Sequence, residues 1–248
     1  MRRSVIVAVT ALACLSNANP ARADRRNFSF TYEATTVPEG EGEIEQYLTA
    51  KALRKGFDSV LDWNYQLELE YGVTDRFDVA VYQMFGQAPE KPLSWQGYKL
   101  RGRYRPVDYE EWPVDPLGYI ELIQKADGAI ALEQKLVLGK RTENLAAAIN
   151  LTFEESGLNR DEKELEFAPS VALGYAPRPW VTIGAEALGV MAWEFKDGKT
   201  ESAAPAYYAG PALSLAHGKA FITFACLWQL GDTAHDRYRA RMLLGIDL

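Results

Sequence analysis

The chain has 248 residues, with 27 basic and 34 acidic side chains and a formal net charge of −7 at pH 7. An acidic chain of this kind lacks the clustered positive charge that nucleic-acid binding requires, so we expect no nucleic-acid partner. Its two cysteines and two histidines have no metal-ligand spacing, and it has no Gly-rich phosphate loop, so the sequence predicts no metal and no cofactor.

Residues 1–23 are organised as a secretory signal peptide. The basic pair Arg2 and Arg3 precedes an apolar run at residues 5–15 that is too short to span a bilayer, and residues 21–23 fit a small-x-small cleavage site. We expect cleavage near Ala23, with a lipoprotein site at Cys14 as the alternative. Cleavage removes three arginines, which changes the net charge to −10, and leaves Cys226 as the only thiol, so we expect no intramolecular disulfide.

Alternation of apolar and polar residues begins soon after this segment. Residues 27–36 alternate, and we predict that residues 24–42 form either an N-terminal extension or a first strand. The clearest case runs from Leu61 to Tyr71, where every odd-numbered residue is apolar and every even-numbered residue is polar. A period of two places these side chains on the two opposite faces of a strand.

About twelve strands are predicted from residue 43 onward, and residues 43–248 form one domain. The predicted strands cover residues 43–53, 61–71, 77–85, 95–105, 117–125, 129–139, 145–154, 164–175, 180–193, 206–216, 220–230 and 237–248. Short connections near positions 72, 142, 177 and 217 alternate with longer ones near 87, 156, 196 and 232, as in an up-and-down meander. Residues 194–205 are predicted as a long loop. Two connections fit the alternation badly, because 106–116 is long for a turn and 127–128 is short for a loop.

The length of these strands favours a membrane barrel over a soluble one. Strands of about 10 to 12 residues span the apolar layer of a bilayer, whereas strands of soluble sandwiches more often have about 5 or 6 residues. We therefore predict an all-β fold, an up-and-down antiparallel transmembrane β-barrel of about twelve strands with lipid outside and water inside. The alternative is a soluble secreted β-sandwich or lipocalin-like barrel that binds a hydrophobic ligand.

The signal peptide, the hairpin at residues 71–79 (YGVTDRFDV) and the alternating final strand resemble bacterial outer-membrane β-barrel proteins, especially uncharacterised porin-like or transporter-like members. The resemblance implies a place in the outer membrane of a Gram-negative bacterium, with outer-membrane lipid and the barrel-assembly machinery as partners. Members of this class usually end in an aromatic residue that the machinery recognises. This chain ends in Ile246-Asp247-Leu248, so it departs from that pattern.

Charged side chains are predicted to line the lumen, because they share the polar parity of their strands. They are Asp62, Glu68, Glu70, Lys99, Arg101, Arg103, Arg105, Glu133, Lys135, Glu166, Glu186, Arg237, Arg239 and Arg241. In one interpretation the acidic and basic rows neutralise one another and brace a narrow barrel. In the other, the cations of residues 99–105 and 237–241 form a positive wall opposite Glu68, Glu70 and Glu166 that favours small anions.

These patterns predict a narrow porin-like channel or uptake protein for small solutes, with no catalytic residue. The alternative is a non-conducting structural or interaction barrel that contacts a partner through the loops at 87–94 and 194–205. A third hypothesis is a rim enzyme that uses His235 with Asp236 or Asp232 on lipid or protein. The spacing of Ser214 and His217 suggests a hydrolase pair, but a turn explains His217 better.

Overall fold

The computed structural model describes residues 25–53, 60–231 and 236–248, which contain fourteen strands. These are β1 (Gly42–Leu53), β2 (Val60–Thr74), β3 (Phe77–Gln87), β4 (Ser94–Tyr104), β5 (Asp115–Lys125), β6 (Ile130–Arg141), β7 (Leu145–Ser156), β8 (Lys163–Phe167), β9 (Ser170–Arg178), β10 (Val181–Lys196), β11 (Lys199–Ser202), β12 (Ala206–His217), β13 (Ala220–Leu230) and β14 (Asp236–Asp247). In this part of the chain, no helix is long and apolar enough to cross a bilayer.

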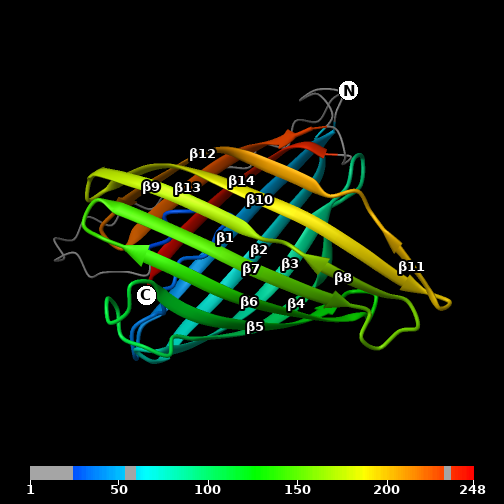
Figure 1. Cartoon of the computed structure of the whole chain (residues 1–248), viewed down its shortest axis with the longest axis horizontal. Coiled ribbons are helices and arrows are strands. Elements are labelled where there is room, and N and C mark those ends of the chain that lie inside the picture. Colours follow the sequence, from blue (N-terminus) through cyan, green and yellow to red (C-terminus); the bar gives the residue numbers. More distant parts are fainter. Residues whose placement is uncertain (1–24, 54–59, 232–235) are drawn as a thin grey trace.

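The strands form one closed barrel in which all pairings are antiparallel and, apart from β8–β9 and β11–β12, strands that follow each other in sequence are paired (Figure 1). The ring closes where β1 pairs with β14, from Glu43 opposite Asp247 to Leu53 opposite Asp236. β8 and β9 both lie between β7 and β10, so they are two parts of one barrel strand, and β11 and β12 both pair with β10 in the same way. The fourteen segments thus make a barrel of twelve strands, which confirms the predicted fold class.

The two ends of the barrel differ in their connections. At one end, here called the turn end, residues 75–76, 142–144, 179–180 and 218–219 make tight turns, and residues 105–114 form the one longer link between described strands. At the other, the loop end, residues 88–93, 126–129 and 157–162 connect the strands. The long link at 105–114 packs back on the turn end of the barrel, where Arg76 donates to Asp108 at 3.0 Å and Lys140 donates to the Trp112 carbonyl at 3.2 Å.

The predicted loop at 194–205 is wrong. β10 continues to Lys196 and pairs with β11, so that Lys196 lies opposite Lys199 in a hairpin. The turn residues Asp197 and Gly198 have φ angles of 50° and 73°. Asp-Gly with both residues in the left-handed region is the favoured two-residue hairpin turn, and it extends this wall of the barrel at the loop end.

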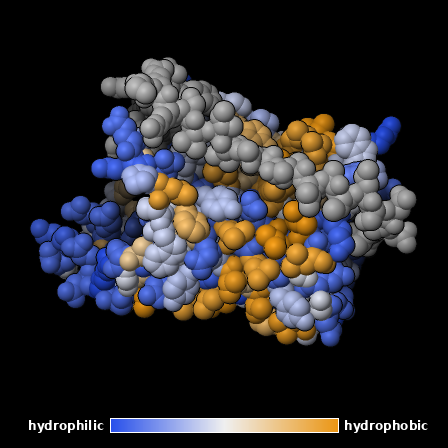
Figure 2. Space-filling view, turned by 180° about the vertical axis from the view of Figure 1, so that it is seen from behind, coloured by the Kyte–Doolittle hydropathy of each residue, from blue (hydrophilic) through white to orange (hydrophobic). Residues whose placement is uncertain are grey.

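Apolar side chains cover the outer face of the barrel. Figure 2 shows them gathered between hydrophilic ends. Aliphatic residues such as Leu67 and Leu69 are 38% and 48% exposed in the middle of β2. Exposed aromatic side chains lie near both ends, with Trp63, Trp95, Tyr207 and Trp228 toward the loop end and Tyr71, Tyr104, Tyr175 and Trp180 toward the turn end. An aliphatic band between two aromatic girdles is typical of barrels that cross a membrane.

Residues 25–41 form no strand and lie inside the ring of strands (Figure 1). Phe28 is completely buried against side chains of the inner wall, among them Tyr208 and Leu227. The segment begins and ends at the turn end, since Arg25 bonds to the Pro179 carbonyl there and residues 36–39 bond to Asp75 and its neighbours. Of the two predicted forms of residues 24–42, the described part is an extension folded back into the barrel.

A charged side chain placed on the outer face should lower the free energy of unfolding by an amount that increases with its depth in the membrane. Leu67 lies midway between the two girdles on β2, and Val73 lies beyond Tyr71 on the same face. We expect Leu67→Arg to lower the free energy of unfolding by about 2–4 kcal/mol and Val73→Arg by about 0–1 kcal/mol. Denaturant unfolding in phospholipid vesicles, followed by tryptophan fluorescence, measures both. Equal costs at the two positions would contradict the membrane assignment.

Candidate functional site

The lumen contains the candidate functional site, and its turn-end half is filled by residues 25–41, which we call the plug. Polar wall residues and plug residues are buried together there. Each charged or polar group removed from water at this point needs a partner, because an unpaired buried group costs free energy. The contacts of the plug therefore show how firmly the wall holds it.

Glu186 on β10 anchors the deepest part of the plug. Its carboxylate accepts hydrogen bonds of 2.8 Å from the backbone N–H groups of Ser29, Phe30 and Thr31, and the Ser29 hydroxyl donates a further one of 3.2 Å. Glu186 is only 2% exposed. Three successive N–H groups around one carboxylate form an anion-binding arrangement in which the plug replaces water. Because the Glu186 carboxylate accepts from these three N–H groups, this part of the plug can be buried without pairing with a strand.

Two arginines of the plug bond to the wall near the turn end. The Arg25 guanidinium donates to the Pro179 carbonyl at 2.6 Å and to the Ser214 carbonyl at 3.1 Å. The Arg26 guanidinium donates to the Tyr47 hydroxyl at 2.7 Å and lies 3.6 Å from the Glu45 carboxylate. Burial opposes the charge of Arg26, but Tyr47 and the neighbouring groups outweigh it and raise the pKa of Arg26 above its usual range. Both plug arginines are thus bonded directly to groups of the wall.

Asn150 and Asp78 hold the returning half of the plug. The Asn150 side chain accepts from the Tyr32 backbone N–H at 2.7 Å and donates to its carbonyl at 2.9 Å, and Asp78 accepts from the Val37 N–H at 3.1 Å. The plug then passes over β2 at Gly72, where an added Cβ would lie 1.9 Å from the Pro38 carbonyl oxygen. Only glycine permits that approach. The plug is thus fixed along its whole described length.

An ion network on β2, β3 and β4 lies beside the plug. Arg101 pairs with Glu68 at 2.6 Å, Glu70 at 2.8 Å and Asp78 at 3.1 Å. Arg103 pairs with Glu70 and Asp78, both at 2.7 Å. All of these side chains are at most 2% exposed. Arg101 and Arg103 of β4 therefore form no free positive wall, because acids on β2 and β3 bond to them directly.

The structure distributes the other predicted lumen residues along the barrel. Lys99 pairs with Glu121 at 2.8 Å, and Lys135 pairs with Glu133 at 3.0 Å. Arg241 donates to the Ser29 carbonyl of the plug at 3.2 Å, whereas Arg105 follows the last residue of β4 and bonds to the Val107 and Asp75 carbonyls. Arg239 pairs with Asp236 at 2.5 Å, Glu166 is half-buried, and Asp62 and Arg237 are exposed toward the loop end.

The prediction missed several wall residues, namely Glu45, Asp78, Glu121 and Asn150. No residue of β1 or β3 is among the predicted ones, although Glu45 and Asp78 lie on the parity opposite to the apolar residues of their strands. Alternation alone is thus a sufficient signal for both. Asn150 carries no charge, and its role depends on a plug whose path the sequence does not reveal. Selecting charged residues on the polar parity therefore identifies part of the site but misses Asn150, which is uncharged.

The candidate catalytic residues do not come together. His235 lies outside the described residues. Ser214 is buried and bonds to Arg25, to the Arg26 carbonyl and to Thr223, while His217 is exposed at the end of β12. The Ser214 hydroxyl thus holds the plug.

Three carboxylates in the lumen have a spacing that a metal ion requires. One oxygen each of Glu45, Glu68 and Glu70 lies within 4.8 Å of the others. Arg101 already pairs with Glu68 and Glu70, and Arg26 lies against Glu45. Cations of the protein itself thus neutralise this cluster.

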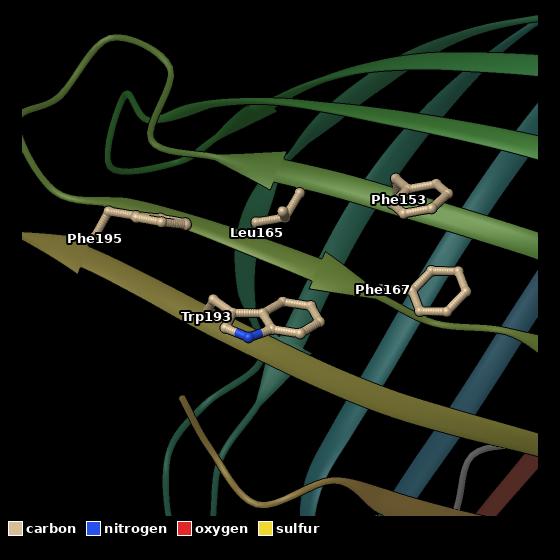
Figure 3. A pocket seen from close by; sticks show the side chains of 5 residues that line it. All are labelled: Phe153, Leu165, Phe167, Trp193 and Phe195. Atoms are coloured by element: carbon tan, nitrogen blue, oxygen red, sulfur yellow. The ribbon is translucent and has the colours of Figure 1, made fainter. Parts of the chain in front are cut away.

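An apolar groove of about 350 Å³ lies on the outer face near the loop end. Figure 3 shows its lining on β7, β8 and β10, formed by Phe153, Leu165, Phe167, Trp193 and Phe195. Phe153 and Phe167 stack with their ring centres 4.6 Å apart. The groove continues the aromatic girdle of the loop end, on the side of the wall opposite to the plug, where it adds to the lipid-facing surface.

Comparisons with known proteins agree with this architecture. Residues 20–108 match a family of unknown function, DUF6662, and no curated protein matches the chain. The chain is similar to the COG4313 outer membrane channel from Pseudomonas putida F1, with a TM-score of 0.61 and 11% identity over 87% of this chain and 98% of that one. It is also similar to the KdgM porin, solved in complex with disordered oligogalacturonate, with a TM-score of 0.52 and 10% identity over 83% and 97% of the two chains. The fold is that of bacterial outer-membrane β-barrels, which confirms the predicted resemblance.

Removal of Arg101 should destabilise the barrel strongly. Arg101→Met leaves Glu68, Glu70 and Asp78 with one buried cation fewer, and breaking a buried ion pair on one side costs about 3–5 kcal/mol. We expect a large fall in the denaturant midpoint, or loss of the heat-modifiable gel mobility of a folded barrel. Arg76→Met is the control, because its pair with Asp108 lies at the surface and should contribute little. Similar midpoints for the two variants would contradict the account of the network.

Proposed function

We propose that this protein is an outer-membrane channel for small solutes whose lumen is closed by its own N-terminal segment, and that it performs no catalytic step. The observation that carries the proposal is the position of the plug. The space that the plug occupies inside the barrel is the space through which a solute would pass, and its hydrogen bonds to Glu186 and Asn150 are individually breakable. Withdrawal of the plug toward the turn end would open a polar path.

The place where the plug begins supports this mechanism. Cleavage of the signal peptide near Ala23 would leave Arg25 close to a free N-terminus, at the turn end where the Pro179 carbonyl holds it. A segment with a free end can leave the lumen without threading a loop through the barrel. Only the other end of the plug, at Gly42, would stay attached to β1.

A non-conducting structural barrel is the second candidate. Phe28 is completely buried among inner-wall side chains that include Tyr208 and Leu227, and full burial of a phenylalanine contributes about 1.5–3 kcal/mol. Together with the ion network this burial favours a lumen that stays closed. The two candidates differ in whether weakening of the plug opens a conducting path.

Planar-bilayer recordings of the Glu186→Ala variant test the proposal. The substitution removes the acceptor of three backbone N–H groups, and a hydrogen bond to a charged group contributes about 1.5–3 kcal/mol. We expect rare conductance steps in the wild-type protein and an open probability at least tenfold higher in the variant.

Glu121→Ala is the matched control for these recordings. Glu121 is a buried lumen carboxylate that bonds to Lys99 and Tyr119 of the wall. Its loss should leave the open probability of the channel close to that of the wild type. Silent membranes with all three proteins would favour the structural barrel, and equal conductance of wild type and Glu186→Ala would show that the plug is not the gate.

A further inference from the structure

The loop-end half of the lumen lies beyond the deepest point of the plug. On β14, Arg241 bonds to the Ser29 carbonyl of the plug, and Arg239 lies two residues closer to the loop end. On β7, Asn150 bonds to Tyr32 of the plug, and Glu154 lies four residues closer to the loop end. The Glu154 side chain is 29% exposed. This half of the lumen, which we call the vestibule, is therefore accessible from the loop end while the plug is in place.

Like charges lie directly opposite each other on adjacent strands of the vestibule wall. On one side Lys51 of β1 is paired in register with Arg239 of β14. On the other side Glu154 of β7 is paired in register with Glu166 of β8. Like charges in directly opposite positions destabilise a sheet. In the plugged half Glu45 and Glu68 are also opposite in register, but Arg26 and Arg101 pair with them there. A like-charge pair without such a partner lowers the stability of the barrel and is a candidate binding site.

The basic pair lies on β14 and β1 and the acidic pair on β7 and β8, so three barrel strands separate the two pairs on one side of the ring and five on the other. Lys51 and Arg239 both act electrostatically on Glu166, to which neither is bonded by any described contact. An acidic side chain lies near each cation of the basic pair. Asp236 bonds to Arg239, and Asp62 lies opposite Lys51 on β2, so the basic side is partly neutralised.

The acidic side is more strongly charged than the basic side. Glu164 also acts on Glu166, and Lys125 lies 4.0 Å from Glu154. Among the described residues, no carboxylate oxygen lies within 4.0 Å of the Lys51 ammonium, so this cation is available to a ligand. A molecule that carries both charges would match both sides at once.

We propose that the vestibule binds small zwitterionic solutes, with their ammonium group against Glu154 and Glu166 and their carboxylate against Lys51 and Arg239. The inference names the solute class of the channel proposed above and rests on that proposal for its role in transport. A solute with a single positive charge can pair only with the acidic side, and a solute with a single negative charge can pair only with the basic side. Because the acidic side has more net charge, the expected order of affinity is zwitterion, then alkylammonium, then alkanoate.

Saturation-transfer NMR on the detergent-solubilised, plugged protein tests this order directly. The probes are 6-aminohexanoate as zwitterion, hexylamine as cation and hexanoate as anion, and we expect 6-aminohexanoate to bind at least threefold more tightly than either of the others. The shorter 4-aminobutyrate and the longer 8-aminooctanoate report which separation of the charges fits. Equal binding of all three six-carbon probes, or no binding of 6-aminohexanoate, overturns the proposal.

Two variants separate binding from stability. Glu166→Gln and Lys51→Gln each remove one of two like charges, so each should raise the denaturant midpoint of the barrel while lowering its affinity for 6-aminohexanoate at least threefold. Asp127→Asn in the β5–β6 turn and Lys163→Gln at the start of β8 are the matched controls outside the vestibule, and should leave the affinity unchanged. Unchanged affinity in both vestibule variants would contradict the assignment.

The binding measurement is independent of conduction. Zwitterion binding to a protein that stays silent in every bilayer recording would overturn the channel and leave the binding site standing. Conductance steps without zwitterion binding would overturn the binding site and leave the channel standing.

Discussion

Closure of the sheet imposes one constraint from which the other features follow. When β1 pairs with β14, every strand of the ring has two partners, and alternate side chains must point to one of two different surroundings. Outside, hydrocarbon accepts Leu67 and Leu69 without any partner. Inside, each charge needs water or an opposite charge. The acids and arginines of β2, β3 and β4 neutralise one another in an ion network, and backbone N–H groups of the plug bond to Glu186.

The plug and the vestibule divide the lumen into two regions with opposite character. In the turn-end half, the charges are paired within short distances and buried, so this half stabilises the closed form. In the loop-end half, the like charges that lie in register remain partly accessible instead of being buried in a network of ion pairs, and their repulsion lowers stability. The proposed channel, which would recognise solutes at its loop end and close at its turn end, uses this division. A barrel with a purely structural role does not require the second region.

Much of the architecture could be predicted from the sequence, because period-two alternation is a local signal. It gave the twelve barrel strands, and it placed Glu68, Arg101 and Arg103 on one parity that the structure buries inside. Asp197-Gly198 is also a turn signal in the sequence, although the predicted loop at 194–205 does not use it. What alternation does not contain is which strands lie beside a given charge and what fills the lumen. The register of β3 and β4 determines that Arg101 pairs with Asp78. The hydrogen bonds from residues 29–31 to Glu186 join positions more than 150 residues apart in sequence.

The central claim is that residues 25–41 lie inside the barrel, with the amides of Ser29, Phe30 and Thr31 bonded to Glu186. Amide hydrogen exchange of the mature protein in lipid nanodiscs, resolved to single residues, tests this most directly. The structure predicts slow exchange at these three amides, although they belong to no strand, and faster exchange at all three in a Glu186→Ala variant. Exchange of the wild-type amides at the rate of an unstructured peptide would contradict the account.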